Sequence, residues 1–123
     1  MGIVELKNDR IAIGVNTHGA ELVSLKSNET DREYMWCGDA AYWGRVSPVL
    51  FPFVGKLENQ TYRHDGVTYE GIPQHGFARD SEFVVAEQTE DTVWFELVKD
   101  EKWQKNYPFD FCLLYTSPSP RDR

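Results

Sequence analysis

Short runs of alternating apolar and polar residues, separated by turn residues, cover most of this chain. Strand-like runs occupy residues 2–7, 10–15, 20–26, 61–64, 67–70, 81–88, 92–99 and 107–115. Asn8-Asp9 separates the first two runs, and Asp65-Gly66 separates 61–64 from 67–70. Both dipeptides favour tight hairpin turns, because Asn, Asp and Gly accept the positive φ that these turns require. The pattern therefore predicts antiparallel hairpins.

The run at 92–99 shows most clearly which face is buried. Val93, Phe95 and Leu97 fall on one side, as expected for a strand with one face in a core. No longer window carries a sustained helical period, and residues 39–45 are predicted to form at most a single helical turn. Many short strands at close spacing predict an all-β chain with an antiparallel β-sandwich.

Composition and charge indicate which partners and which compartment suit the chain. The chain has 123 residues, 41% of them hydrophobic, and a net charge of −7, which predicts one folded domain and disfavours nucleic acid and anionic membranes as partners. Cys37 and Cys112 do not form a zinc motif and suit a reducing compartment. The beginning of the chain lacks a signal peptide's apolar core, and no run is long enough for a membrane helix. We therefore expect a cytoplasmic protein, and its oligomeric state stays open.

An apolar stretch with a polar end is the first candidate binding segment. Residues 48–55 read Pro-Val-Leu-Phe-Pro-Phe-Val-Gly, and the polar residues Lys56, Glu58, Asn59 and Gln60 follow. Proline cannot donate to a central sheet, so the stretch is expected at a strand edge or in a buried loop. An apolar wall that ends in polar groups is typical of a small-ligand pocket.

The three histidines have different surroundings. His18 lies in an expected turn, and His64 lies beside the Asp65-Gly66 turn. His75 is followed by Gly76, whose missing side chain permits a close backbone approach, and an imidazole can exchange a proton near neutral pH. From the residues alone, His75 is either a catalytic group or a hydrogen-bonded structural residue.

Two long motifs resemble the aldose 1-epimerase family, in particular its LacX-like branch. They are Trp-Gly-Arg-Val-Ser-Pro-Val-Leu-Phe-Pro-Phe-Val-Gly-Lys at 43–56 and Gln-His-Gly-Phe-Ala-Arg-Asp-Ser-Glu-Phe at 74–83. Residues 19–25 and 106–111 also fit, so the resemblance runs from about residue 3 to 111. It implies a large antiparallel β-sandwich, the galactose mutarotase-like supersandwich, with a sugar site on its concave face.

The resemblance also implies an activity and a set of site residues. The family interconverts the α and β anomers of aldoses by acid–base ring opening without a cofactor, and some relatives act on hexose 6-phosphates. His75 matches the family's first histidine, which helps to polarise the sugar. Lys56 and Asn59 match its Gly-Arg-x-x-Asn segment, with lysine in place of arginine, and Arg79 matches an arginine that could bind hydroxyls or a phosphate. The alternative for Arg79 is a surface ion pair with Asp80 or another acid.

The family's second histidine and its glutamate base would lie beyond the residues present here. We therefore expect residues 1–111 to be the N-terminal part of an epimerase-like isomerase that is inactive on its own. The alternative is a non-catalytic carbohydrate-binding β-sandwich module. A third possibility is that the chain does not fold stably alone, because apolar sheet edges would be exposed.

The end of the chain changes character. Residues 112–123 read Cys-Leu-Leu-Tyr-Thr-Ser-Pro-Ser-Pro-Arg-Asp-Arg, which resembles translated sequencing-adapter sequence. We expect a non-native or disordered tail here, with the native domain ending near Phe111. In the alternative interpretation, the segment is a genuine flexible tail.

Overall fold

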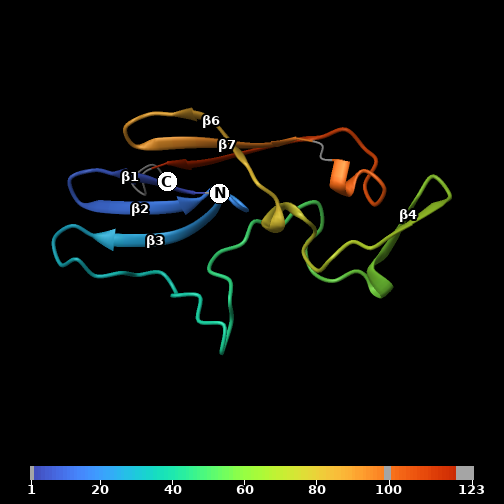
Figure 1. Cartoon of the computed structure of the whole chain (residues 1–123), viewed down its shortest axis with the longest axis horizontal. Helices are drawn as coiled ribbons and strands as arrows, with labels where there is room; N and C mark the ends of the chain where they lie inside the picture. Colours follow the sequence, from blue (N-terminus) through green and yellow to red (C-terminus); the bar gives the residue numbers. More distant parts are fainter. Residues whose placement is uncertain (1, 99–100, 119–123) are drawn as a thin grey trace.

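A computed structural model describes residues 2–98 and 101–118 of the chain (Figure 1). Its strands are β1 (Ile3–Lys7), β2 (Ile11–Asn16), β3 (Glu21–Ser27), β4 (Thr61–His64), β5 (Val67–Glu70), β6 (Val84–Gln88), β7 (Thr92–Val98) and β8 (Cys112–Pro118). Three single-turn 3₁₀ helices also occur, η1 (Glu58–Gln60), η2 (Ala78–Asp80) and η3 (Glu101–Trp103). Within the described residues there is no α-helix, and no helix could cross a membrane.

The first sheet has the antiparallel order β1-β2-β3. Asn8 shapes its first turn, because its side-chain Oδ1 accepts the N–H groups of Arg10 at 2.8 Å and Ile11 at 2.9 Å. A second antiparallel sheet has the order β6-β7-β8, and β4 and β5 form a separate hairpin. The hairpins predicted at Asn8-Asp9 and Asp65-Gly66 are therefore present.

The core lies between the two three-stranded sheets, which Figure 1 shows one above the other. Leu6 and Ile13 face inward from the first sheet, while Val93, Phe95 and Leu97 face inward from β7. The predicted inner face of β7 is thus confirmed. Two antiparallel sheets that share one apolar core make an all-β sandwich, as predicted.

The hairpin β4–β5 extends from the opposite end of the molecule in Figure 1. Between it and the sheets run the two loop segments that carry the long sequence motifs. The sandwich therefore serves as a scaffold, and the candidate binding residues lie on the loops beside it.

Two sequence predictions need correction. The run 107–115 was expected to be one strand, but β8 begins only at Cys112. Residues 107–111 form a loop because Tyr107 and Phe111 turn their rings into an aromatic cluster around Phe51 and Phe77. The run 81–88 becomes a strand only at Val84.

The segment 39–45 contains one hydrogen-bonded turn, closed by Trp43 N–H to the Asp39 carbonyl at 2.9 Å. At the other end of the chain, a tail was expected from residue 112. The structure places Cys112–Pro118 in β8, antiparallel to β7, and residues 119–123 lie outside the described part. The non-native origin of residues 112–123 stays a prediction.

Candidate functional site

The two sequence motifs meet as neighbouring loop segments, 51–60 and 72–78. The Phe51 carbonyl accepts the N–H of Phe77 at 3.0 Å, and the Phe51 N–H donates to the His75 carbonyl at 3.2 Å. Farther along, Ile72 N–H donates to the Gln60 carbonyl at 3.2 Å. Main-chain hydrogen bonds therefore fix the two motifs side by side.

Gly76 makes this close approach possible. Its φ is +79°, and a Cβ atom built on it would lie 2.1 Å from the Phe51 carbonyl oxygen. No real side-chain carbon can occupy that position, since the distance is far below a van der Waals contact. The glycine after His75 is thus required both by its backbone conformation and by the space available.

His75 is half-buried, with an unusual φ of +66°. Its main-chain N–H donates to the Gly55 carbonyl at 2.8 Å, and the Gly55 N–H donates to the imidazole Nδ1 at 2.8 Å. These reciprocal bonds join the histidine motif to the residue that precedes Lys56. They hold the orientation of the ring without the help of another side chain.

Lys56 and Asn59 occupy the exposed end of the other segment. Asn59 lies inside η1 with a φ of +54°, a conformation that asparagine adopts more readily than most residues. Within the described part of the chain, no hydrogen bond or ion pair joins any two of the side chains of Lys56, Asn59, His75 and Arg79. The main chain brings the segments of Lys56, Asn59 and His75 together.

Arg79 lies in η2, close to the first sheet. Its carbonyl packs against Gly19, where an added Cβ would come within 2.6 Å of that oxygen. Its side-chain Nε is buried and has no hydrogen-bond partner among the described residues. Asp80, the expected alternative partner of Arg79, instead pairs with Arg45 at 2.8 Å.

An aromatic cluster supports the histidine motif from behind. Phe77 is fully buried, stacks on Trp103 with ring centroids 5.1 Å apart, and meets Phe51 edge to face at 6.3 Å. Trp103 carried no distinguishing signal in the sequence. The high aromatic content indicated that such a cluster could form, but the contact joins residues 26 positions apart and depends on the chain path.

Tyr62 anchors the β4–β5 hairpin to the same cluster. Its hydroxyl donates to the Asn106 carbonyl at 2.8 Å, and its ring meets those of Phe53 and Tyr107 with centroids 5.1 Å and 6.4 Å apart. Within the hairpin it also stacks on Tyr69 at 5.0 Å. Burial, followed by the neighbouring Tyr107 and Tyr69, raises the pKa of Tyr62 to about 12. The hydroxyl therefore stays protonated at neutral pH and acts as a donor.

The other two histidines lie in ordinary structural positions. His18 Nδ1 is 3.5 Å from a Glu82 oxygen, and the Thr17 hydroxyl donates to the second Glu82 oxygen at 2.5 Å. The Thr17 bond is the largest of the interactions that lower the pKa of Glu82. His64 ends β4, and its ring meets Phe109 at 5.1 Å.

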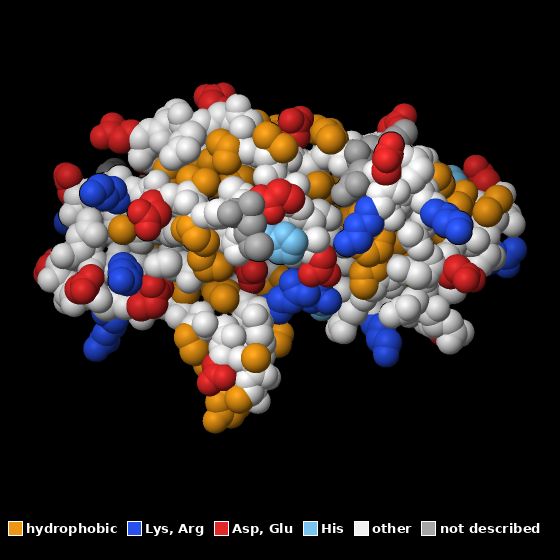
Figure 2. Space-filling model, in the orientation of Figure 1, with side chains coloured by type: hydrophobic (Ala, Val, Ile, Leu, Met, Phe, Trp, Pro, Cys, Tyr) orange, Lys and Arg blue, Asp and Glu red, His pale blue; other side chains and the backbone are white. Residues whose placement is uncertain are grey.

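The residues 34–46 form a loop that projects from the body and carries exposed hydrophobic side chains (Figure 2), among them Tyr34, Trp36, Tyr42 and Trp43. Trp36 and Trp43 are 41% and 50% exposed, and the Trp36 Nε1–H donates to the Trp43 carbonyl at 2.7 Å. Trp94 is half-buried on the outer side of β7. None of these three indoles lies in the core.

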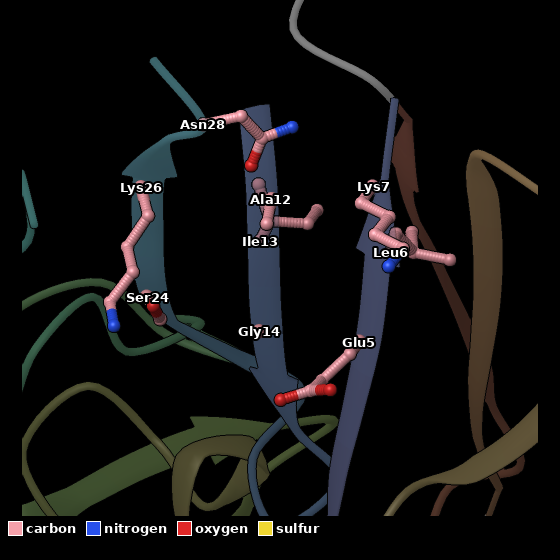
Figure 3. A pocket seen from close by; sticks show the side chains of 9 residues that line it. All are labelled: Glu5, Leu6, Lys7, Ala12, Ile13, Gly14, Ser24, Lys26 and Asn28. Carbon is pink, nitrogen blue, oxygen red and sulfur yellow. The ribbon is translucent and has the colours of Figure 1, made fainter. Parts of the chain in front are cut away.

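A shallow hollow of about 480 Å³ lies over the first sheet, away from the candidate residues (Figure 3). Ala12 and Gly14 of β2 form its floor, and the side chains of Glu5, Lys7 and Lys26 stand around it. It includes none of Lys56, Asn59, His75 or Arg79. Among the described residues, no group of three or more His, Cys, Asp or Glu is placed to hold a metal ion.

Comparison with known proteins identifies the type of domain. The family model for aldose 1-epimerase matches residues 2–117. The chain belongs to the aldose 1-epimerase family. The match extends past Phe111 into β8, beyond the boundary expected from the sequence.

Individual relatives agree with this assignment. The chromosomal LacX protein of Lactococcus lactis is 36% identical over 92% of the chain. A solved galactose mutarotase related enzyme from Lactobacillus acidophilus superposes with a TM-score of 0.92 at 40% identity, over 95% of the chain. A galactose mutarotase-like protein from Lactobacillus casei superposes with a TM-score of 0.91 at 36% identity. The predicted galactose mutarotase-like fold and the LacX-like resemblance are confirmed.

The chain spans only part of these relatives. It covers 40% of the LacX protein and 39% of the Lactobacillus acidophilus chain. The activity of a whole family member therefore does not transfer directly to these 123 residues.

Proposed function

We propose that this chain forms one wall of the sugar site of an aldose 1-epimerase-like isomerase. The observation that carries the proposal is the His75–Gly55 hydrogen-bond pair, which aligns the histidine motif with the loop that bears Lys56. His75 is half-buried, so that part of its side chain meets solvent, and the buried Phe77 follows it two positions later. That setting suits a group that must contact a polar ligand in a defined orientation.

In the proposed reaction, a base takes the proton of the anomeric hydroxyl while an acid protonates the ring oxygen. The bond between C1 and the ring oxygen breaks, the open-chain aldehyde rotates about its C1–C2 bond, and the ring closes on either face. Proton removal and delivery balance, so no cofactor is consumed. His75 contacts the sugar and polarises it, while Lys56, Asn59 and Arg79 bind its hydroxyls.

Arg79 is the side chain whose contacts would differ between a free sugar and a sugar phosphate. An Escherichia coli (strain K12) relative, 27% identical over 93% of the chain, is named provisionally as a glucose-6-phosphate 1-epimerase. A guanidinium with a buried, unpaired Nε can pair with a phosphate through its fork of donors. We propose that Arg79 contacts either the sugar hydroxyls or a 6-phosphate.

Titration of Arg79→Gln and Arg79→Lys with glucose and glucose 6-phosphate separates these roles. If Arg79 binds phosphate, Arg79→Gln weakens glucose 6-phosphate binding more than glucose binding, and Arg79→Lys, which keeps the charge, falls between wild type and Arg79→Gln. Equal weakening of both ligands assigns Arg79 to the hydroxyls. Unchanged binding of both ligands contradicts a substrate-binding role.

We further propose that the chain alone does not catalyse the reaction. Among the described residues, His75 forms hydrogen bonds only with the main chain of Gly55 and Phe51, so no acidic side chain is paired with it there. Ring opening needs one group to remove a proton and another to deliver one, and a single imidazole supplies only one of these at a time. The same observation favours the alternative of a non-catalytic carbohydrate-binding module.

Polarimetry tests this directly. Mutarotation of α-galactose and of α-glucose is followed with and without the chain, and the expected result is the same rate as in buffer. Clear acceleration that His75→Ala abolishes would show that the chain is catalytically sufficient. Acceleration that persists in His75→Ala would remove His75 from the mechanism.

A further inference from the structure

The imidazole of His75 is held by a main-chain amide, not by another side chain. The Gly55 N–H reaches Nδ1 at 2.8 Å, while the His75 N–H returns to the Gly55 carbonyl at 2.8 Å. The main-chain bond sets the position of the His75 backbone against Gly55, and the bond to Nδ1 sets the orientation of the ring.

This geometry determines where the proton of a neutral imidazole resides. A neutral ring has one N–H donor and one nitrogen with a free lone pair. An amide N–H can only donate, so the nitrogen that it faces must be the acceptor. With the Gly55 N–H directed at Nδ1, the proton is on Nε2.

We infer that the Gly55 main-chain amide is a positioning group that holds His75 in the Nε2–H tautomer, so that the ring donates a hydrogen bond to a sugar oxygen. The tautomer rests on the Gly55 bond alone, whereas the identification of the acceptor as a sugar oxygen rests on the proposed function. In this state Nε2 has no free lone pair, so His75 does not take the proton of the anomeric hydroxyl. The base must be a different residue.

The sequence supplies this arrangement through backbone conformation at Gly55. Its φ is +89°, and a Cβ built on it would have no atom within 4 Å. Space is therefore not the reason for glycine at this position. The reason is the left-handed conformation, which turns the N–H toward His75 at little steric cost.

The backbone of His75 is fixed from its other side as well. Phe51 N–H donates to the His75 carbonyl at 3.2 Å, and Gly76 packs directly on the Phe51 carbonyl. These contacts fix the main chain from which the ring extends, and the Gly55 N–H then fixes the ring itself. These contacts make the tautomer a property of the folded chain even without a ligand.

Nuclear magnetic resonance of the chain labelled with nitrogen-15 at histidine and glycine tests the inference without any sugar. Long-range proton–nitrogen correlations report which ring nitrogen carries the proton, and His18→Asn and His64→Asn assign the other two rings by loss of signal. The expected result at neutral pH is a single Nε2–H tautomer for His75, with a scalar coupling across the hydrogen bond from the Gly55 nitrogen to Nδ1. An Nδ1–H tautomer, or a mixture of tautomers, would overturn the inference.

A chemical variant isolates the role of Gly55. Replacing the Val54–Gly55 amide by an ester, through peptide ligation, removes the N–H and keeps the chain length and side chains. The expected result is that His75 loses its single tautomer while the core resonances of Phe95 stay in place. If His75 keeps the Nε2–H tautomer in a folded ester variant, Gly55 is not the positioning group. If the ester variant unfolds, the labelled wild-type chain still decides the tautomer.

The two proposals fail in different ways. Addition of galactose to the same labelled sample reports sugar binding independently of the tautomer. An Nε2–H tautomer with no response to sugar contradicts the proposed function and leaves the Gly55 inference standing. A response to sugar from an Nδ1–H ring contradicts the Gly55 inference alone.

Discussion

Two glycines of this chain have almost the same backbone conformation but different surroundings. Gly76 has a φ of +79° and packs on the Phe51 carbonyl. Gly66, in the β4–β5 turn, has a φ of +78°, and a Cβ added to it would meet nothing within 4 Å. The pair separates the cost of a positive φ from the cost of a steric clash.

Gly76→Ala is expected to destabilise the chain much more than Gly66→Ala. A positive φ costs an alanine about 1–2 kcal/mol, and both variants share that cost. Only Gly76→Ala also forces the two motifs apart, which we expect to bring its total loss to roughly 3 kcal/mol or more. Urea unfolding followed by tryptophan fluorescence measures both, and equal losses would contradict the close packing at Gly76.

The residues of the candidate site were predictable to different degrees. The close approach at Gly76 followed from the sequence, because a glycine has no side chain to prevent it, whereas the role of His75 stays a prediction. The bond from Gly55 to Nδ1 did not follow from it, since it joins residues 20 positions apart and depends on how the loop 51–60 turns. The unpaired Nε of Arg79 likewise depends on Asp80 pairing with Arg45.

At the scale of elements, the β4–β5 hairpin depends on contacts outside itself. A two-stranded hairpin is marginal in water, so its attachment to the aromatic cluster matters. Tyr62 provides that attachment through its hydroxyl bond to the Asn106 carbonyl and through its ring contacts with Phe53 and Tyr107.

Tyr62→Phe is expected to lower the free energy of unfolding by about 1 kcal/mol, the usual net value of one hydrogen bond. Tyr34→Phe, at a side chain that is 58% exposed, is the control and should change the free energy of unfolding by less than about 0.5 kcal/mol.

The pKa of Tyr62 is raised from 10.0 to about 12. The stability that its neutral form provides is therefore complete below pH 10 and is lost as the pH rises toward 12. Urea midpoints should therefore fall more in wild type than in Tyr62→Phe across that interval, and identical pH profiles would contradict the assignment.

The Glu33 side chain binds the segment that follows β3 to β3 itself. Its carboxylate accepts the Ser24 hydroxyl at 2.6 Å and the N–H groups of Leu25 at 2.8 Å and Met35 at 3.0 Å. The Ser24 bond is the largest cause that lowers the pKa of Glu33 below its ordinary value of 4.5. A lowered folded-state pKa means that the stabilisation is complete above 4.5 and is lost as the pH falls through the folded-state value.

Glu33→Gln should therefore make the stability of the chain depend less on pH in the acidic range. Between neutral pH and about pH 3, the wild-type urea midpoint is expected to fall more steeply than that of Glu33→Gln. Glu29→Gln, an exposed neighbour, is the matched control and should follow wild type. An unchanged pH dependence in Glu33→Gln would show that the carboxylate bonds contribute nothing to stability.

The elements themselves were largely readable from the sequence. Turn residues at Asn8-Asp9 and Asp65-Gly66 located hairpins, and alternation in β7 identified its buried face. The segment 107–111 was predicted as a strand because its aromatic residues resemble those of strands. Its rings instead pack against residues far away in the sequence, which a local pattern cannot reveal.

At the scale of the whole molecule, the sandwich and the candidate site occupy different places. The two sheets share the core, and the motif-bearing loops lie between them and the β4–β5 hairpin (Figure 1). The regions of the described surface that compete as sites for a small polar ligand are the His75 wall, the hollow over the first sheet and a smaller hollow of about 310 Å³ between β5 and Asn106. Family membership and the motif residues favour the His75 wall.

The measurement that tests this account most directly is a titration of the uniformly labelled chain with galactose and glucose, mapped by amide chemical shifts. We expect changes that cluster at Gly55, Lys56, His75 and Arg79 and that are lost in His75→Ala, while Lys7 and Lys26 in the hollow stay unchanged. Changes centred on Lys7 and Lys26, changes that are the same in a folded His75→Ala variant, or no change at all would contradict the assignment of the sugar site to His75.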